Sequence, residues 1–183
     1  MDKIEWLMFN FTLPKEPSRV RVSVWRKLKK SGSVNIGQSM WLLPLTDKHE
    51  EAFREISNEI LQNNGEAYIL RSVFICMGNK TDIRDVFNTA RDEEYKEFID
   101  KCEDCQHEID KETKKGNFSF AEIEENEREL HKLTDWLAAI SERDFFGASL
   151  KNSAAEELTK CRAVLDEYSG VVYEKNTADD NNA

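Results

Sequence analysis

The first candidate for chemistry is a cluster of cations on the helix that the sequence predicts from about Ser18 to Lys30. On a helix with about 100° between successive residues, three of these cations share one face and two lie on its flanks. The central three are Arg19, Arg26 and Lys30, and the flanking two are Lys27 and Lys29. Grouped guanidinium and ammonium ions can neutralise phosphates, so this face is predicted to contact DNA or another anion. An ordinary solvated helix face is the alternative.

The opposite face of the same helix is apolar and is predicted to be buried. Its members are Val20, Val24, Trp25 and Leu28. We expect Trp25 to lie beneath the cations, as a brace between the helix and the rest of the fold. Arg21 falls in the centre of this apolar face, where an unpaired guanidinium would be costly. It is therefore expected either to reach solvent near the helix start or to pair with an acid from elsewhere in the chain.

A second candidate is the run that contains Cys102, Cys105 and His107, whose spacing is similar to that of metal ligands. Both cysteines, and Cys161 as well, fall on predicted apolar helix seams, where free cysteine behaves as a small buried hydrophobe. Acidic neighbours such as Glu103 disfavour the thiolate that a redox sensor requires. We therefore predict structural cysteines and no cofactor, with a thiol or metal sensor as the alternative.

Catalytic patterns are weak elsewhere in the sequence. His49, His107 and His131 are isolated, and the 7 glycines are scattered along the chain. Neither a nucleophile–histidine order nor a phosphate-binding glycine loop is therefore recognisable. A nuclease of the ferredoxin-like type would hold a metal with a carboxylate near the end of the first strand, where this sequence has Asn10. The chain is therefore predicted not to be an enzyme.

Charge is unevenly distributed along the chain, whose formal net charge is -10. Residues 1–80 contain 12 Lys and Arg against 9 Asp and Glu, whereas residues 81–183 contain 14 against 27. An acidic segment repels nucleic acid, so any DNA contact is expected in the first part. The apolar run from Trp6 to Phe11 is far shorter than the ~20 residues that span a bilayer, and the 4 cysteines do not indicate a secreted disulfide scaffold. These features predict a cytoplasmic protein with no membrane partner.

The elements that would position these residues fall into two parts. Residues 5–76 are predicted to fold as strand, helix, strand, strand, helix, strand, which is the ferredoxin-like split βαβ order. Residues 82–173 carry apolar positions at near-heptad spacing and are predicted to form an antiparallel helical half packed on the first, with a disordered tail at 174–183. The fold class is therefore α+β. Because the first strand is apolar on both faces, one face is expected to meet the helical half or another subunit, as in a homodimer.

Several short motifs occur in an order and spacing that resembles the amino-terminal domain of the ChrB chromate-resistance regulators. They are Trp6, Leu13-Pro14, Arg19-Val20-Arg21, Trp25-Arg26, Trp41-Leu42-Leu43-Pro44, Arg91-Asp92-Glu93-Glu94-Tyr95, Phe118-Ser119-Phe120-Ala121-Glu122 and Arg143-Asp144-Phe145-Phe146. The resemblance covers about residues 5–173 and also suggests a relation to the ferredoxin-like domain of PaaX-type repressors. It implies a role in chromate resistance, either in transcriptional regulation or in sensing.

The sequence departs from the family's pattern in two places. The full-length regulators are longer and carry a carboxy-terminal domain, so this chain is expected to be a stand-alone amino-terminal domain whose regulatory activity does not follow automatically. The family's Asp-Gly turn before the Leu-Leu-Pro run is replaced here by Gly37-Gln38-Ser39, so that turn is expected to be built differently.

The recurring motifs also supply candidate ion pairs. Glu122 and Asp144 are the acids that could pair with Arg21, and Arg143 is a further charged member of the same motifs. The leading hypothesis is a ChrB-type regulatory or accessory protein that binds DNA through the first helix. The residues predicted to make that contact are Arg19, Arg26, Lys27 and Lys30. The alternative is a protein-interaction or dimerisation module that does not bind DNA.

Overall fold

The chain divides into two compact units. A computed structural model describes residues 4–74 and 82–180. The first unit is Met1–Phe87 and the second is Asn88–Ala183, called below the sheet unit and the helical unit. The division falls within the first long helix, a few residues later than the interval between residues 76 and 82 where the sequence pattern predicts it.

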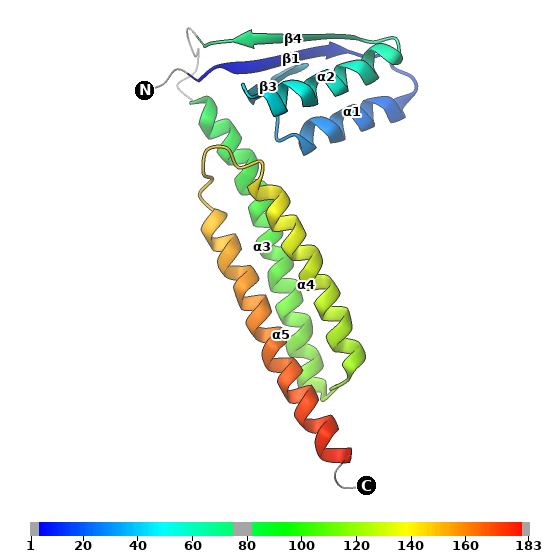
Figure 1. Ribbon diagram of the computed structural model, residues 1–183, viewed down its shortest axis with the longest axis vertical. Helices are drawn as coiled ribbons and strands as arrows, with labels where there is room; N and C mark the ends of the chain where they lie inside the picture. The colour runs from blue at the N-terminus through cyan, green and yellow to red at the C-terminus, as the bar shows by residue number, and fades with distance from the viewer. Residues whose placement is uncertain (1–3, 75–81, 181–183) are drawn as a thin grey trace. The chain divides into compact units, whose positions relative to one another are not determined.

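The sheet unit has the predicted order of strands and helices. Its elements are β1 (Trp6–Thr12), α1 (Ser18–Lys30), β2 (Val34–Gly37), β3 (Met40–Pro44), α2 (Asp47–Gln62) and β4 (Glu66–Ser72). The four strands pair antiparallel in the order β2-β3-β1-β4, and α1 and α2 lie against one face of the sheet (Figure 1). This is the split βαβ topology, and the prediction of a mixed α+β fold is confirmed.

Alternation along β1 determines which side chains meet the two helices. Leu7 pairs with Leu43 and Phe9 with Trp41, and all four are buried. The ring of Phe9 stacks on Phe53 of α2 with 4.9 Å between centroids. The helices contribute Val20, Val24 and Leu28 from α1, and Phe53, Ile56 and Ile60 from α2. These residues form the core that orients α1 and so decides which of its side chains face water.

The other sheet face is apolar but less completely covered. Trp6 is buried and stacks on Phe87 with 5.6 Å between ring centroids. Farther along the same face, Tyr68 and Leu70 of β4 are 57% and 49% exposed. The expectation that this second face meets the helical half or another subunit stays a prediction.

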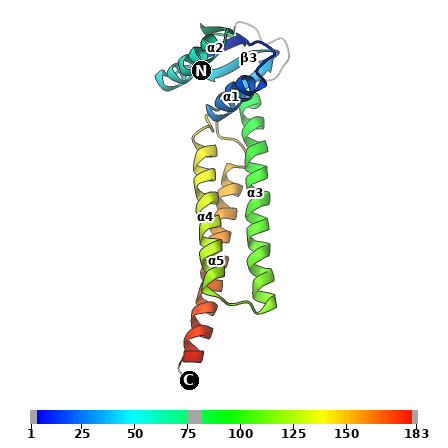
Figure 2. The same ribbon diagram turned by 90° about the vertical axis from the view of Figure 1, so that its right-hand side faces the viewer.

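The helical unit contains α3 (Ile83–Lys115), whose first residues belong to the sheet unit, followed by α4 (Phe120–Ser141) and α5 (Lys151–Asp180). The three helices run antiparallel and side by side (Figures 1 and 2). Their core follows the predicted seams and is built from Tyr95, Phe98, Cys102, Cys105 and Ile109 of α3, Leu133 and Ile140 of α4, and Ala154, Leu158, Cys161, Leu165 and Tyr168 of α5. Among the described residues, no helix has the length and apolar content needed to cross a membrane.

The predicted disordered tail is wrong for residues 174–180, because α5 continues to Asp180. Lys175 and Asn176 in this last part contact Phe118 in the turn between α3 and α4. The side-chain amide of Asn176 donates hydrogen bonds to the carbonyl oxygens of Phe118 at 3.2 Å and Val172 at 2.7 Å. The ammonium of Lys175 lies 3.6 Å from the centroid of the Phe118 ring. Polar composition therefore indicated disorder where cation–π and side-chain contacts prolong the helix.

Candidate functional site

The outward face of α1 carries most of the predicted DNA-binding residues. Arg19, Arg26 and Lys30 are all exposed, and the helix contains no acidic residue. Only Val20, Val24 and Leu28 are buried, so the helix packs through one narrow stripe. The structure therefore presents these three cations together to solvent, as the helical spacing predicts.

Lys27 differs from the other candidates because it already has a partner. Its ammonium lies 2.7 Å from a carboxylate oxygen of Glu59 on α2. Lys27, followed by Ser23, holds the pKa of Glu59 below its usual value. The cation that the sequence groups with Arg26 is therefore partly neutralised by α2, a contact that no local pattern indicates.

Trp25 corrects the sequence interpretation of this helix. The predicted buried brace is 52% exposed, and its neighbour Val22 is 46% exposed. The ammonium of Lys29 lies 5.9 Å from the centroid of the Trp25 ring. The buried stripe is centred on Val24, and Trp25 lies about 100° around the helix from it, so the indole extends toward solvent. A shallow hollow beside it is lined by Ser18, Arg21, Val22, Trp25 and Arg26.

For Arg21 the sequence left two alternatives, a side chain that reaches solvent near the helix start and an ion pair with a distant acid, and the structure shows the first. Arg21 is exposed rather than buried, because its flank of α1 faces water and its long side chain leaves the apolar stripe. It forms no ion pair with any other residue that the structure describes. The two acids have partners within the helical unit: Glu122 accepts a hydrogen bond from Asn117, and Asp144 pairs with Lys151. Arg21 therefore belongs to the cationic surface of α1.

Two family-like motifs, separated by about fifty residues in the chain, meet in the helical unit. Glu94 of α3 accepts a hydrogen bond from Arg143 at 2.7 Å and forms an ion pair with Arg91 at 3.1 Å. The Arg91 side chain is 1% exposed and that of Arg143 is 18% exposed. Burial lowers the pKa of Arg91, an effect that Glu94 opposes. Glu94 therefore pairs with two largely buried guanidinium ions, and the charge of the fully buried Asp144 carboxylate further favours the Arg91 cation.

The remaining acids of these motifs fasten the α4–α5 connection. The carboxylate of Asp144 accepts hydrogen bonds from the backbone N–H groups of Gly147 and Ala148, both at 2.9 Å. The carboxylate of Asp92 accepts hydrogen bonds from the Ser149 hydroxyl and the Leu150 N–H, both at 2.9 Å. Arg143 and Asp144 are thus charged residues with partners, as predicted, but their partners lie within the helical unit and their contacts join its helices.

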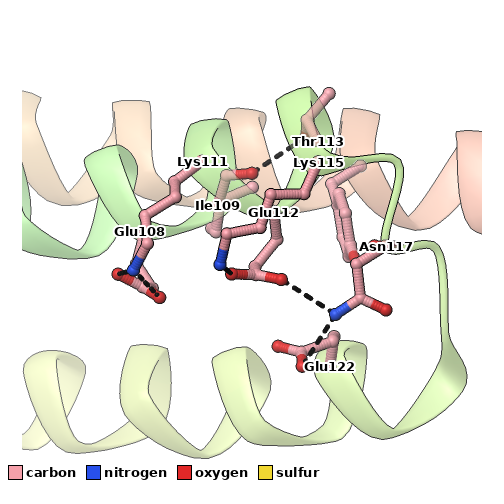
Figure 3. A network of polar contacts seen from close by, with 9 residues as sticks. Glu108, Ile109, Lys111, Glu112, Thr113, Lys115, Asn117 and Glu122 are labelled. Carbon is pink, nitrogen blue, oxygen red and sulfur yellow. Dashed lines mark hydrogen bonds and ion pairs between the residues drawn. The ribbon is translucent and has the colours of Figure 1, made fainter.

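Glu122 takes part in a second polar network where α3 turns into α4 (Figure 3). The side-chain amide of Asn117 donates to Glu112 at 2.8 Å and to Glu122 at 3.1 Å, bridging the two carboxylates. Lys115 pairs with Glu112 at 2.6 Å, and Lys115 and Asn117 together hold the pKa of Glu112 below its usual value. Ser119 caps α4 by accepting a hydrogen bond from the Glu122 N–H. These contacts assign Glu122 to the turn between α3 and α4.

Three cysteines converge in the core of the helical unit. Cys102, Cys105 and Cys161 are all buried. The Cys161 thiol donates to the carbonyl oxygen of Cys102 at 3.3 Å and accepts a hydrogen bond from Gln106 at 3.5 Å. Hydrogen bonding from Cys105, with further hydrogen bonds from Cys102 and Gln106, lowers the pKa of Cys161 to about 7. Burial, together with the neighbouring Cys161, raises the pKa of Cys102 to about 12.

The metal-ligand-like spacing of Cys102, Cys105 and His107 does not correspond to a coordination site among the residues that the structure describes. His107 is exposed, whereas Cys102 and Cys105 point into the core. Within residues 4–74 and 82–180, no three His, Cys, Asp or Glu side chains are grouped so as to hold a metal ion. The cysteines contact one another and Gln106, and Cys161 is a member of this cluster that the sequence spacing did not connect with Cys102 and Cys105.

One surface feature was not apparent from the sequence. Between α3 and α5 lies a groove of about 780 Å³, here called the acidic groove. Its buried and half-buried lining includes Phe118, Val164, Tyr168 and Val171. The acids along it are Glu103, Asp110, Glu157 and Glu167. The apolar seams of α3 and α5 predict their packing, but the groove depends on how far apart the two helices lie.

Together, the split βαβ sheet unit with its cationic helix and the antiparallel helical unit define a two-part α+β protein with an exposed basic surface. The sequence matches the family described as "Protein ChrB, N-terminal" over residues 21–179, and the chain belongs to that family. It is therefore a chromate-resistance-associated protein. Neither the curated proteins nor the solved structures contain a significant match.

Proposed function

We propose that this chain is a regulatory protein of chromate resistance that contacts DNA phosphates through the outward face of α1. The observation that supports this proposal best is a set of exposed cations that form no ion pair with any described residue. They are Arg19, Arg21, Arg26, Lys29 and Lys30. Proteins that bind nucleic acid use such clusters, because each neutralised phosphate releases condensed counterions.

The geometry of α1 favours a few simultaneous phosphate contacts. Arg19, Arg26 and Lys30 share one face of a 13-residue helix, which spans about 20 Å at ~1.5 Å per residue. Three phosphate contacts predict that the logarithm of affinity falls with the logarithm of salt concentration with a slope of about -2.7 per chain. Such contacts position a protein on the duplex, whereas sequence preference requires additional contacts to base edges.

The uneven charge of the chain is consistent with this assignment. The cations on α1 belong to the sheet unit, whereas residues 81–183 contain 27 acidic against 14 basic residues. The helical unit would repel phosphates, so the proposal requires α1 alone to approach the duplex. Trp25 lies among these cations and is 52% exposed, which gives the surface an aromatic ring as well as charge.

A second candidate function is a protein-interaction or dimerisation module that does not bind DNA. Tyr68 and Leu70 favour it, because both are large apolar side chains about half exposed on the sheet face opposite α1 and α2. Exposed apolar side chains in a group are typical of surfaces that bind another protein. This candidate predicts self-association or partner binding with no dependence on nucleic acid.

The proposal is tested by salt titration of binding to the duplex upstream of the protein's own operon. We compare the wild type with Arg26→Ala and with Lys27→Ala, a neighbouring cation that Glu59 already neutralises. Arg26→Ala is expected to make the slope shallower by about 0.9 and to weaken all sequences alike. Lys27→Ala is expected to change this slope less. Undetectable binding at low salt would reject DNA recognition by this chain, and an unchanged slope in Arg26→Ala would reject the role of α1.

A further inference from the structure

The acidic groove of the helical unit has a chemistry that the proposed DNA contact does not use. We propose that this groove binds the outward face of α1 from a second copy of this chain. Both complementary surfaces are present on every copy, so two chains can exchange contacts reciprocally and close a dimer. The inference does not depend on DNA binding, although such a dimer would cover the cations that the proposed function assigns to phosphates.

The apolar parts of the two surfaces match. Val22 and Trp25 stand three residues apart on α1 and are 46% and 52% exposed. The groove offers aromatic and aliphatic side chains beneath its rim, among them Phe118 and Tyr168. Its volume of about 780 Å³ lies within the ~300–1,000 Å³ of ordinary ligand pockets. A helix that inserts one apolar edge into such a groove is a recurrent mode of protein recognition.

The charges on the groove also complement those of α1. Lys160, the lysine along the groove, lies 2.6 Å from Glu157 and is thereby neutralised. Glu103 and Glu167 are exposed and form no ion pair with any described residue. On α1, Arg21 and Arg26 flank Trp25 and are likewise without a described acidic partner. Opposite charges on the two rims favour this pairing and set its register.

The test is a measurement of molar mass by light scattering over a range of protein concentrations, without DNA. The wild type is expected to approach twice the monomer mass at low salt and to dissociate as salt screens the charges. The double variant Glu103→Lys/Glu167→Lys reverses the charge of the groove rim. The double variant Arg21→Glu/Arg26→Glu reverses the charge of the α1 surface. Each variant alone is expected to remain monomeric, because like charges then face each other in both contacts of its dimer. Glu124→Lys/Glu127→Lys, an equal charge change on exposed residues of α4 outside the groove, is expected to dimerise like the wild type.

Mixing the two reversed variants gives the decisive result. In a mixed dimer, the reversed helix meets the reversed groove and the native helix meets the native groove, so both contacts are again attractive. Restored dimerisation would support the proposal and would show that both variants are folded. A monomeric wild type, dimerisation of the groove variant as strong as that of the α4 control, or failure of the mixture to associate would each overturn it. Because no DNA is present, these outcomes leave the proposed DNA contact to its own test.

Discussion

Replacing Glu94 by Gln tests whether one carboxylate balances the charge of two guanidinium ions in the helical unit. The substitution keeps the shape of the side chain and removes its charge. Arg91, whose side chain is 1% exposed, would then lose its ion-pair partner at 3.1 Å. Three guanidinium nitrogens, Arg91 Nε, Arg91 Nη1 and Arg143 Nε, are already buried without a hydrogen-bond partner among the described residues. Asp144 would remain as a buried acid whose charge favours the Arg91 cation, although it forms no direct ion pair with Arg91 among the described contacts.

Breaking a buried ion pair by removing one partner costs about 3–5 kcal/mol. Glu94 is 27% exposed, and a glutamine carbonyl can still accept one hydrogen bond. We therefore expect a loss at the lower end of that range, about 3 kcal/mol of unfolding free energy. For a cooperative unit of this size the loss corresponds to a decrease in Tm of roughly 10 °C or more.

Urea and thermal unfolding followed by far-ultraviolet circular dichroism would measure this loss. Glu93→Gln is the matched control, because Glu93 is the exposed neighbouring acid and its replacement is expected to change stability by less than about 0.5 kcal/mol. Adding Arg91→Met to Glu94→Gln removes the uncompensated charge and is expected to restore part of the stability. If Glu94→Gln and Glu93→Gln unfolded alike, the argument that Arg91 depends on Glu94 would be refuted.

Two further predictions concern the core and the thiols. Leu28→Ala, at a fully buried position of α1, should destabilise the sheet unit by about 2–5 kcal/mol, whereas Trp25→Ala, at a 52% exposed position, should cost less than about 1 kcal/mol. Equal losses in urea unfolding would contradict the assigned orientation of α1. Cys161 should ionise near pH 7, below its ordinary value of 9.0, as pH rises. This step should appear as thiolate absorbance in the ultraviolet and vanish in Cys161→Ser; its persistence there would assign the thiolate to another cysteine.

Local periodicity was enough to predict most of the architecture. The order of elements in the sheet unit and the apolar seams of α3, α4 and α5 follow from spacings within each segment, and they agree with the structure. The Ser119 cap of α4 is a local feature of the same kind, because it joins residues three positions apart in the chain. The family resemblance also rests on short motifs in order, and the family match confirms it. Such features are encoded locally and need no knowledge of distant contacts.

The tertiary structure alone decided the environment of individual side chains. Trp25 and Val24 are adjacent in the chain, yet one is about half exposed and the other fully buried, because α2 and the sheet determine the rotation of α1. Lys27 is partly neutralised because Glu59 lies on a different helix. Helical spacing shows which residues share a face, but it does not show which neighbouring element will cover that face.

The charged motifs show most clearly what the sequence determines and what only the tertiary structure decides. The sequence alone established that Arg91, Glu94 and Arg143 belong to conspicuous charged runs, and that residues 81–183 are strongly acidic. That Glu94 balances both arginines was decided only when α3 and the end of α4 came together in the fold. The acidic groove likewise exists only between packed helices. Charge and periodicity are properties of a chain, whereas the pairing of Glu94 with Arg143 and the acidic groove require residues from separate segments to share one region of space.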